Sequence, residues 1–132
     1  MNLLSNMSFG LFLRCSVRLR QQIQCRLLYS MVCITVPENE LATRLAHEMV
    51  TKNMIACANI IPKVTSVYLW KGTVCEDKEV FMFLKTRTTR VKEVVEFVQQ
   101  NHPYEVCEVI SLPITGGSSK YLNWVGEVVP PK

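Results

Sequence analysis

The chain has 132 residues, 48% of them hydrophobic, and carries 15 basic and 11 acidic side chains for a net charge of +4. This length predicts one globular domain, and no apolar run approaches the ~20 residues that a membrane-spanning helix needs. The excess charge lies in the first 30 residues, because the rest of the chain is balanced at 11 basic and 11 acidic residues. A balanced domain gives no electrostatic reason to expect nucleic acid binding.

Residues 1–30 differ in composition from the rest of the chain. They are rich in Arg, Ser and Leu and contain Arg14, Arg18, Arg20 and Arg26 without any acidic residue. This composition predicts a mitochondrial-type presequence; the alternative is a disordered leader with no address. A secretory signal is not expected, because arginines occupy the segment where its apolar region and cleavage site belong. We therefore expect a mitochondrial or cytoplasmic protein.

The six cysteines are scattered singly along the chain, without a C-x-x-C pair. This spacing argues against a disulfide framework. We expect most of the thiols to be free and buried, in a protein of a reducing compartment.

A strand and a helix are the first predicted elements of the domain. Residues 31–36 form a short buried-type strand, which Pro37 ends because proline cannot donate to a ladder. Asn39 is expected to cap the helix that follows, in which apolar residues recur at helical spacing from position 41 to position 50.

A long β-hairpin is expected next, with residues 55–70 and 80–84 as its arms. Gly72, which can adopt the positive φ of a tight turn, and the charged residues 76–79 are expected to connect them. Pro62 interrupts the first arm and predicts a bend or bulge. Both faces of the second arm are apolar, which implies cover on both sides, and a domain of about 100 residues buries two sheet faces poorly. We therefore expect a second subunit on one face.

The second half of the domain predicts another helix and strand. Thr88 or Thr89 is expected to cap a helix whose valines from 91 to 98 form a buried stripe. His102 precedes a proline and ends this helix. Residues 105–112 are expected to form the last core strand.

A short terminal helix completes the predicted domain. It is expected over residues 120–128, with Ser118 or Ser119 as its cap. The order of elements is the β-α-β-β-α-β, ferredoxin-like plan of an α+β domain, followed by this helix. The domain is expected to span residues 31–129, with residues 130–132 as a tail.

Six short motifs carry a resemblance to a known family. They are Ala-Cys-Ala-Asn-Ile-Ile-Pro at 56–62, Thr-Ser-Val-Tyr-Leu-Trp-Lys-Gly at 65–72, Leu-Lys-Thr at 84–86, His-Pro-Tyr-Glu at 102–105, Glu-Val-Ile-Ser-Leu-Pro at 108–113 and Tyr-Leu-Asn-Trp at 121–124. In this order and spacing they resemble the CutA family of divalent-cation-tolerance proteins over about residues 31–129. The resemblance implies a ferredoxin-like subunit that assembles into a homotrimer through its long hairpins.

For function, the resemblance implies a non-enzymatic protein associated with copper and other divalent cations. It also implies, for animal members, a role in anchoring or maturation of acetylcholinesterase. No serine, cysteine or histidine lies in a recognisable nucleophile-and-base arrangement, which agrees with a non-enzymatic role. The trimers are also similar to PII signalling proteins, so the alternative is a sensor that binds a small molecule between subunits.

Two residues are the candidate metal ligands. Alternation along residues 105–112 predicts Glu108 on an apolar face, where a carboxylate has to pair, bind a metal or shift its pKa. The alternative is an ion pair with Lys85 or Arg87, within the chain or across the subunit boundary. His102 is the second candidate, because imidazole binds borderline metals; the alternative is that it caps helix carbonyls.

The resemblance also indicates what this metal site lacks. Relatives that bind copper are associated with a first-strand cysteine, whose position falls on or near Ile34 here, while Cys33 beside it points to the opposite face. The equivalent histidine is either His102 or Asn101. We therefore expect a weakened site for copper or another divalent cation, made of His102 and Glu108.

Aromatic side chains supply the expected subunit interface. The residues expected to fill it are Tyr68, Trp70, Phe81, Phe83 and Trp124. The alternative is that Tyr68, Trp70 and Trp124 stack on a ligand. For the small-molecule alternative, the expected cleft residues are Lys85, Tyr104, Glu105 and Glu108.

Overall fold

The structure, a computed structural model, describes residues 28–132. The candidate presequence therefore lies outside the described residues, apart from its last three positions. The elements are β1 (Tyr29–Val36), α2 (Asn39–Thr51), β2 (Cys57–Trp70), β3 (Thr73–Arg87), η1 (Thr88–Arg90), α3 (Val91–Asn101), β4 (Val109–Pro113) and α4 (Ser119–Val128). This order confirms the predicted plan. None of the helices described is long and apolar enough to cross a membrane.

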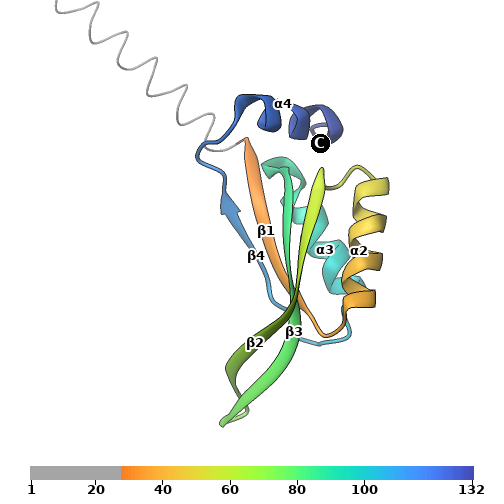
Figure 1. Cartoon of the computed structure of the whole chain (residues 1–132). Coiled ribbons are helices and arrows are strands. Elements are labelled where there is room, and N and C mark those ends of the chain that lie inside the picture. The colour runs from red at the N-terminus through yellow and green to blue at the C-terminus, as the bar shows by residue number, and fades with distance from the viewer. Residues whose placement is uncertain (1–27) are drawn as a thin grey trace, which may run out of the picture.

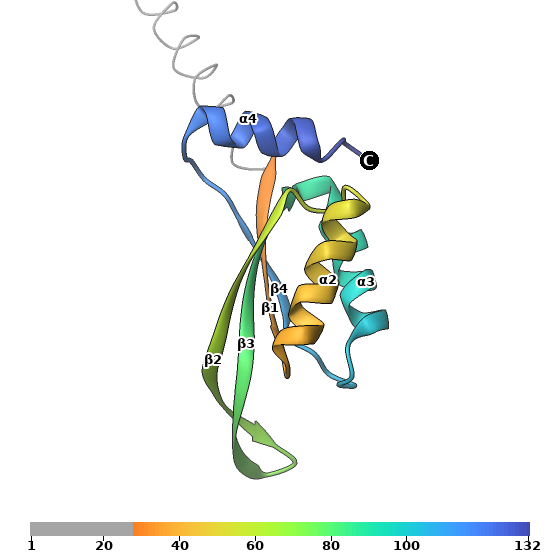
Figure 2. The same ribbon diagram turned by 45° about the vertical axis from the view of Figure 1, so that its right-hand side comes forward.

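The four strands form one antiparallel sheet in the order β2-β3-β1-β4. Helices α2 and α3 lie side by side on one face of the sheet, and α4 lies across the end at which β1 begins (Figures 1 and 2). The arrangement is the ferredoxin-like fold of an α+β domain, as predicted.

The core lies between the sheet and the helices α2 and α3. Strand residues that alternate with a period of two meet one apolar stripe from each helix. The buried side chains are Val32, Ile34, Val36, Val80, Met82 and Leu84 from the strands, and Ala42, Leu45, Met49, Val94 and Val98 from the helices. Burial of one Val, Leu, Ile or Met contributes about 1.5–3 kcal/mol, so this layer is the main source of the subunit's stability.

The opposite face of the sheet, here called the open face, consists of Met31, Cys33, Thr35, Phe81, Phe83, Ile110 and Leu112. Phe81 and Phe83 pack edge to face on it, with ring centroids 4.8 Å apart. Ile110 is 51% exposed and Leu112 is 45% exposed. The prediction that both faces of the β3 arm are apolar is therefore confirmed, and within residues 28–132 helices cover one of the two.

The long hairpin is formed by β2 and β3, and its far end projects beyond the rest of the domain (Figure 1). Lys71 with φ of 49° and Gly72 with φ of 82° form its two-residue turn. Two successive positive φ angles match the type I′ turn that suits the twist of a hairpin. A register shift follows Ile61, and Lys63 has a φ of 61°, so the bulge predicted at Pro62 is confirmed.

The β3 arm is longer than the sequence pattern predicts. The prediction of a charged connection over residues 76–79 is wrong, because β3 begins at Thr73 and these residues pair with β2. Charged side chains are compatible with this part of the strand because most of the projecting hairpin is exposed to solvent.

Two strand boundaries also differ from prediction. β4 begins at Val109, so the prediction of a strand from residue 105 is wrong. The proline after His102 sends the chain through bends at residues 103–106 before it can pair with β1. β1 begins at Tyr29, two residues earlier than predicted, and Tyr29 is buried against α4.

The helix caps agree with prediction in one case of three. Ser118 caps α4, its hydroxyl accepting from the Tyr121 N–H at 3.5 Å. The other two cap predictions are wrong. Glu38, not Asn39, precedes α2, and its side chain makes no capping bond. Thr88 lies in the η1 turn, and its hydroxyl is 2.9 Å from that of Ser30 on β1.

The last residues of the chain are bound to the domain. Arg90 donates to the Pro130 carbonyl at 3.0 Å, and Lys132 pairs with Glu93 at 3.1 Å. Arg87 at the end of β3 donates through Nε to the Val129 carbonyl at 2.5 Å and through Nη2 to the Gly126 carbonyl at 2.6 Å. The carbonyls at a helix C-terminus lack partners within the helix and favour a cation. Arg87 therefore joins α4 to the sheet.

We expect Arg87→Met to lower the free energy of unfolding by about 1.5–3 kcal/mol, because hydrogen bonds from a charged group to helix carbonyls are lost. The measurement is urea denaturation at one fixed protein concentration. Arg44→Met is the matched control, since Arg44 pairs with Glu48 on the exposed surface of α2 and such pairs contribute about 0.5 kcal/mol or less. Equal losses in the two variants would contradict the role assigned to Arg87.

Candidate functional site

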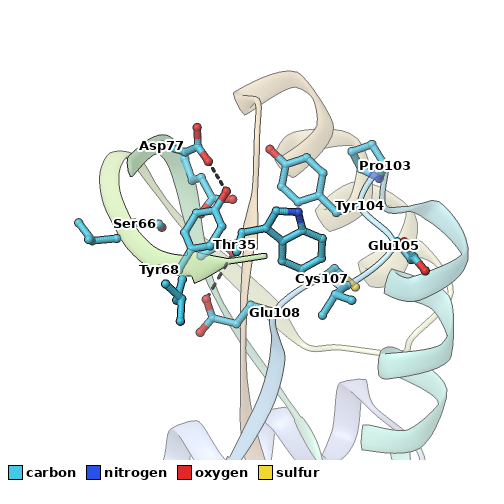
Figure 3. Close-up of a pocket in the computed structure, with 14 residues that line it drawn as sticks. Thr35, Ser66, Tyr68, Asp77, Pro103, Tyr104, Glu105, Cys107 and Glu108 are labelled. Atoms are coloured by element: carbon cyan, nitrogen blue, oxygen red, sulfur yellow. Dashed lines mark hydrogen bonds between the residues drawn. The ribbon is translucent and has the colours of Figure 1, made fainter. Parts of the chain in front are cut away.

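A pocket of about 920 Å³ lies where the hairpin, the end of β1 and the α3–β4 connection meet (Figure 3). Residues 66–70 of β2, with Asp77 and Glu79 of β3, form the hairpin side. Thr35 of β1 and residues 103–108 form the other side. Because Thr35 belongs to the open face, the pocket continues that face at the hairpin end of the sheet.

Tyr68 and Asp77 form one wall of the pocket (Figure 3). The Tyr68 hydroxyl donates to the Asp77 carboxylate, because diagonal neighbours on two strands lie within reach of a long side chain. This hydrogen bond is the main reason that the pKa of Tyr68 is raised to about 12. The phenol therefore keeps its proton at neutral pH and remains a donor to Asp77.

His102 holds the α3–β4 connection against β1. Its Nε2 is 2.9 Å from the Thr35 carbonyl, and its Nδ1 accepts from the Tyr104 N–H at 3.1 Å. A carbonyl only accepts and a backbone N–H only donates, so these partners require the neutral tautomer with the proton on Nε2. The ring also packs against Tyr104, with centroids 5.0 Å apart. Both imidazole nitrogens of this candidate metal ligand therefore already make hydrogen bonds to backbone groups of the same chain.

Glu108 lies just before β4, and its surroundings differ from the predicted ones. The residue is exposed, and its carboxylate accepts from the Thr35 hydroxyl at 3.4 Å. Within the chain Glu108 makes no ion pair with Lys85 or Arg87, because Lys85 donates to the Asn59 side chain and Arg87 binds the carbonyls near α4. The ion pair across a subunit boundary stays a prediction. His102 and Glu108 therefore both contact Thr35, His102 at its backbone carbonyl and Glu108 at its side-chain hydroxyl.

The first-strand positions near these ligands lie as the sequence predicts. Ile34 is fully buried beneath the helices, whereas Cys33 faces the open face. Burial, and secondly the Glu108 carboxylate, raise the pKa of the Cys33 thiol. Cys33 is therefore held as a protonated thiol, a weak ligand and nucleophile. Within residues 28–132, no three His, Cys, Asp or Glu side chains lie close enough together to hold a metal ion.

The residues predicted for the subunit interface fall in three places. Tyr68 and Trp70 line the pocket, and Phe81 and Phe83 lie on the open face. Trp124 is on α4, its ring centroid 5.4 Å from that of Tyr121. A single chain does not bring these residues together.

The predicted cleft residues are only partly brought together. Tyr104, Glu105 and Glu108 line the pocket, but Lys85 does not. The Lys85 ammonium donates to Asn59 on the neighbouring strand and to the Phe83 carbonyl at 3.3 Å. No basic side chain takes its place among the lining residues.

Two acidic residues of the pocket, Asp77 and Glu79, were not predicted from the sequence. They lie in the charged run that the sequence pattern assigns to a connection. A signal was available, because Glu79 continues the period-two alternation of Phe81 and Phe83 and so lies on their side of β3.

Comparisons with known proteins agree with this fold. Residues 30–128 match the family described as CutA1 divalent ion tolerance protein. The chain is 48% identical over 97 residues to the Protein CutA homolog of Xenopus laevis, covering 74% of this chain and 64% of that protein. It is 43% identical over 96 residues to the divalent-cation tolerance protein CutA of Thermus thermophilus, covering 73% and 93% of the two chains.

A similar solved structure is that of CutA1 from Oryza sativa, with a TM-score of 0.78 and 39% identity over 82% of this chain and 99% of that one. The match spans 64% of the Xenopus relative, and between 52% and 54% of the mouse, human and Arabidopsis relatives. The residues matched by the family, 30–128, cover the strands and helices of the domain apart from Tyr29 at the start of β1. The chain belongs to the CutA1 divalent ion tolerance protein family.

Proposed function

We propose that the protein is a non-enzymatic homotrimer that acts in the binding and tolerance of copper or another divalent cation, and that it also anchors a protein partner. The observation that carries the trimer is the apolar open face. The metal role is supported by the family to which the chain belongs and by the meeting of His102 and Glu108 at Thr35. For the partner, the family resemblance points to acetylcholinesterase.

The trimer is supported by surface that one chain leaves uncovered. Ile110 and Leu112 are exposed beside Phe81 and Phe83 on the open face, and the projecting hairpin adds exposed Val67 and Leu69. An exposed apolar patch such as the one on the open face is rare on a monomeric protein and marks an association site. The hairpin extends beyond its own domain (Figure 2), so it is in a position to contact a neighbouring subunit.

The metal site proposed for His102 and Glu108 is weak. A metal on His102 has to replace either the Thr35 carbonyl or the Tyr104 N–H as the partner of an imidazole nitrogen. The thiolate that would favour Cu(I) is replaced by the aliphatic side chain of Ile34, which lies in the core. Nitrogen and oxygen donors remain, and these suit Cu(II) or zinc.

A second candidate function is a sensor of PII type that binds a small molecule. The pocket of about 920 Å³ favours it, since ligand sites are concave, contain aromatic residues and lie at the junction of elements. The open face continues into the pocket, so in a trimer the pocket would lie beside a neighbouring subunit.

Light scattering on the full chain is expected to give about three times the 15.1 kDa subunit mass. Phe83→Asp places a charge on the open face and is expected to reduce the soluble yield, because each subunit relies on its neighbours. Val50→Asp, on the outer side of α2, is the matched control and is expected to keep the trimeric mass. A monodisperse wild-type monomer at micromolar concentration would overturn the proposed assembly.

Metal binding is expected to be measurable for Cu(II) and weak for Cu(I). Competition with a chromogenic chelator is expected to show at least about tenfold weaker Cu(II) binding after His102→Ala or Glu108→Gln, since each removes one ligand. The matched control is His47→Ala, because His47 is the other histidine of the chain and lies exposed on α2. Tight binding that survives both ligand variants would move the site elsewhere, to Cys33 or Cys57.

The first 30 residues are proposed to direct the protein to mitochondria. Fused to a fluorescent reporter, they are expected to colocalise with a mitochondrial marker, and replacement of Arg14, Arg18, Arg20 and Arg26 by Gln is expected to abolish this, because the basic face is lost. A diffuse cytosolic signal from the unaltered segment would favour the cytoplasmic alternative.

A further inference from the structure

The open face of the sheet is apolar along its length. Phe83 on β3 and Ile110 on β4 are both register partners of Cys33 on β1, so the three strands present apolar side chains side by side. Ile110 is 51% exposed and Leu112 is 45% exposed. Such a surface associates with any apolar group that is held close to it.

At its hairpin end the open face runs into the acidic pocket. The carboxylates there are those of Asp77, Glu79, Glu105 and Glu108, and no lysine, arginine or histidine is among the residues that line the pocket. Residues 1–27, here called the leader, carry four arginines and no acidic residue, whereas the rest of the chain is balanced. The basic excess of the chain and the acidic end of the open face are therefore complementary in charge.

The leader also contains a short apolar segment, residues 9–13. All of them except Gly10 are large and apolar, namely Phe9, Leu11, Phe12 and Leu13, and Arg14 follows directly. The open face presents the same two chemistries next to each other, an apolar surface that ends at a group of carboxylates. Residues 9–14 therefore match the open face in both polarity and charge.

The point at which the leader joins the domain is within reach of the open face. The leader ends before Leu28, whose carbonyl accepts from the Thr88 N–H at 3.0 Å, and β1 begins there beside α4, opposite the projecting hairpin (Figures 1 and 2). Residues 14–27 span at most about 50 Å, whereas β1 from Tyr29 to Thr35 is about 20 Å long. This tether is long enough to pass α4 and return along the sheet. It also makes the contact intramolecular, at an effective concentration on the order of millimolar.

We propose that residues 9–13 of the leader bind the open face of their own subunit, with Arg14 and Arg18 at the acidic pocket, and that they compete there with the neighbouring subunit. The proposal rests on the proposed trimer, because it concerns the face through which the subunits are proposed to meet. A neighbour offers a whole open face and a hairpin, so the full chain remains trimeric at micromolar concentration. The leader lowers the fraction of subunits whose open face is free, and it therefore weakens and slows assembly.

The test compares the full chain with its double variant Leu11→Asp/Leu13→Asp. Dissociation is measured by sedimentation velocity over a dilution series, and the rate of assembly is measured by light scattering after dilution from urea. The variant is expected to reach half-dissociation at an at least about tenfold lower concentration and to assemble at least about threefold faster, because its open face is free. Leu3→Asp/Leu4→Asp is the matched control, with the same change in charge outside residues 9–13, and is expected to behave as wild type does.

The arginines are tested in the same two measurements. Arg14→Gln/Arg18→Gln is expected to shift both in the same direction as Leu11→Asp/Leu13→Asp but by less, because the apolar contact remains. The difference between this variant and wild type is expected to disappear at 1 M salt, where charges are screened beyond about 3 Å.

The outcomes distinguish the leader contact from the trimer. Trimers in every sample, with faster assembly in Leu11→Asp/Leu13→Asp and not in Leu3→Asp/Leu4→Asp, support both, also where no trimer dissociates on dilution. A monomeric wild type beside a trimeric Leu11→Asp/Leu13→Asp supports the leader contact and overturns the trimer of the full chain. Monomers in every sample overturn the trimer and the leader contact with it. Trimers that assemble and dissociate alike in wild type and Leu11→Asp/Leu13→Asp, or an equal shift in the control, overturn the leader contact alone.

Discussion

The structure depends on one strand, β3, whose two sides are both apolar. Its even-numbered residues Val80, Met82 and Leu84 are buried beneath α2 and α3, and this layer fixes the position of the helices on the sheet. Its odd-numbered residues Phe81 and Phe83 lie on the open face. A strand of this kind cannot satisfy both sides within about 100 residues, because a small domain has too little material for two cores. The proposed association of subunits would therefore follow from the same pattern that builds the fold.

Two local backbone features determine the shape of the long hairpin: the turn at its end and the bulge in its first strand. The turn at Lys71 and Gly72 matches the twist of the strands, so β2 and β3 pair from Trp70 and Thr73 at the turn to Cys57 and Lys85 at the other end. The bulge near Pro62 changes the register partway along, and bulges bend and twist the strand that contains them. The projecting half of the hairpin and the α3–β4 connection line two sides of one pocket, and His102 holds that connection in place through its bond to the Thr35 carbonyl.

The sequence predicts those parts of the fold that follow from a short-range period. Alternation in β3, the helical spacing in α2 and α3, the turn at Gly72 and the bulge at Pro62 are all local, and the structure agrees with them. The start of β4 was not predictable in this way, since it depends on where the connection after Pro103 reaches β1. The pocket is also beyond local patterns: Lys85 and Glu108 are both on or near the sheet, yet Lys85 turns to Asn59 and Glu108 to Thr35. Glu79 is a buried residue, but it belongs to a run of charged residues, and such a run is typical of a segment exposed to solvent.

The proposed metal site and the proposed small-molecule pocket have residues in common, so binding at one would affect binding at the other. Glu108 is a candidate metal ligand, and together with Thr35 it also lines the pocket. A divalent cation bound at Glu108 would change the charge of the pocket wall that a small molecule meets, and a bound small molecule would in turn change the affinity for the metal. By linkage the two effects are equal in free energy, whatever their size. Metal binding and small-molecule binding are consequently not independent alternatives in this chain. If both ligands bind, the apparent affinity for each depends on the concentration of the other.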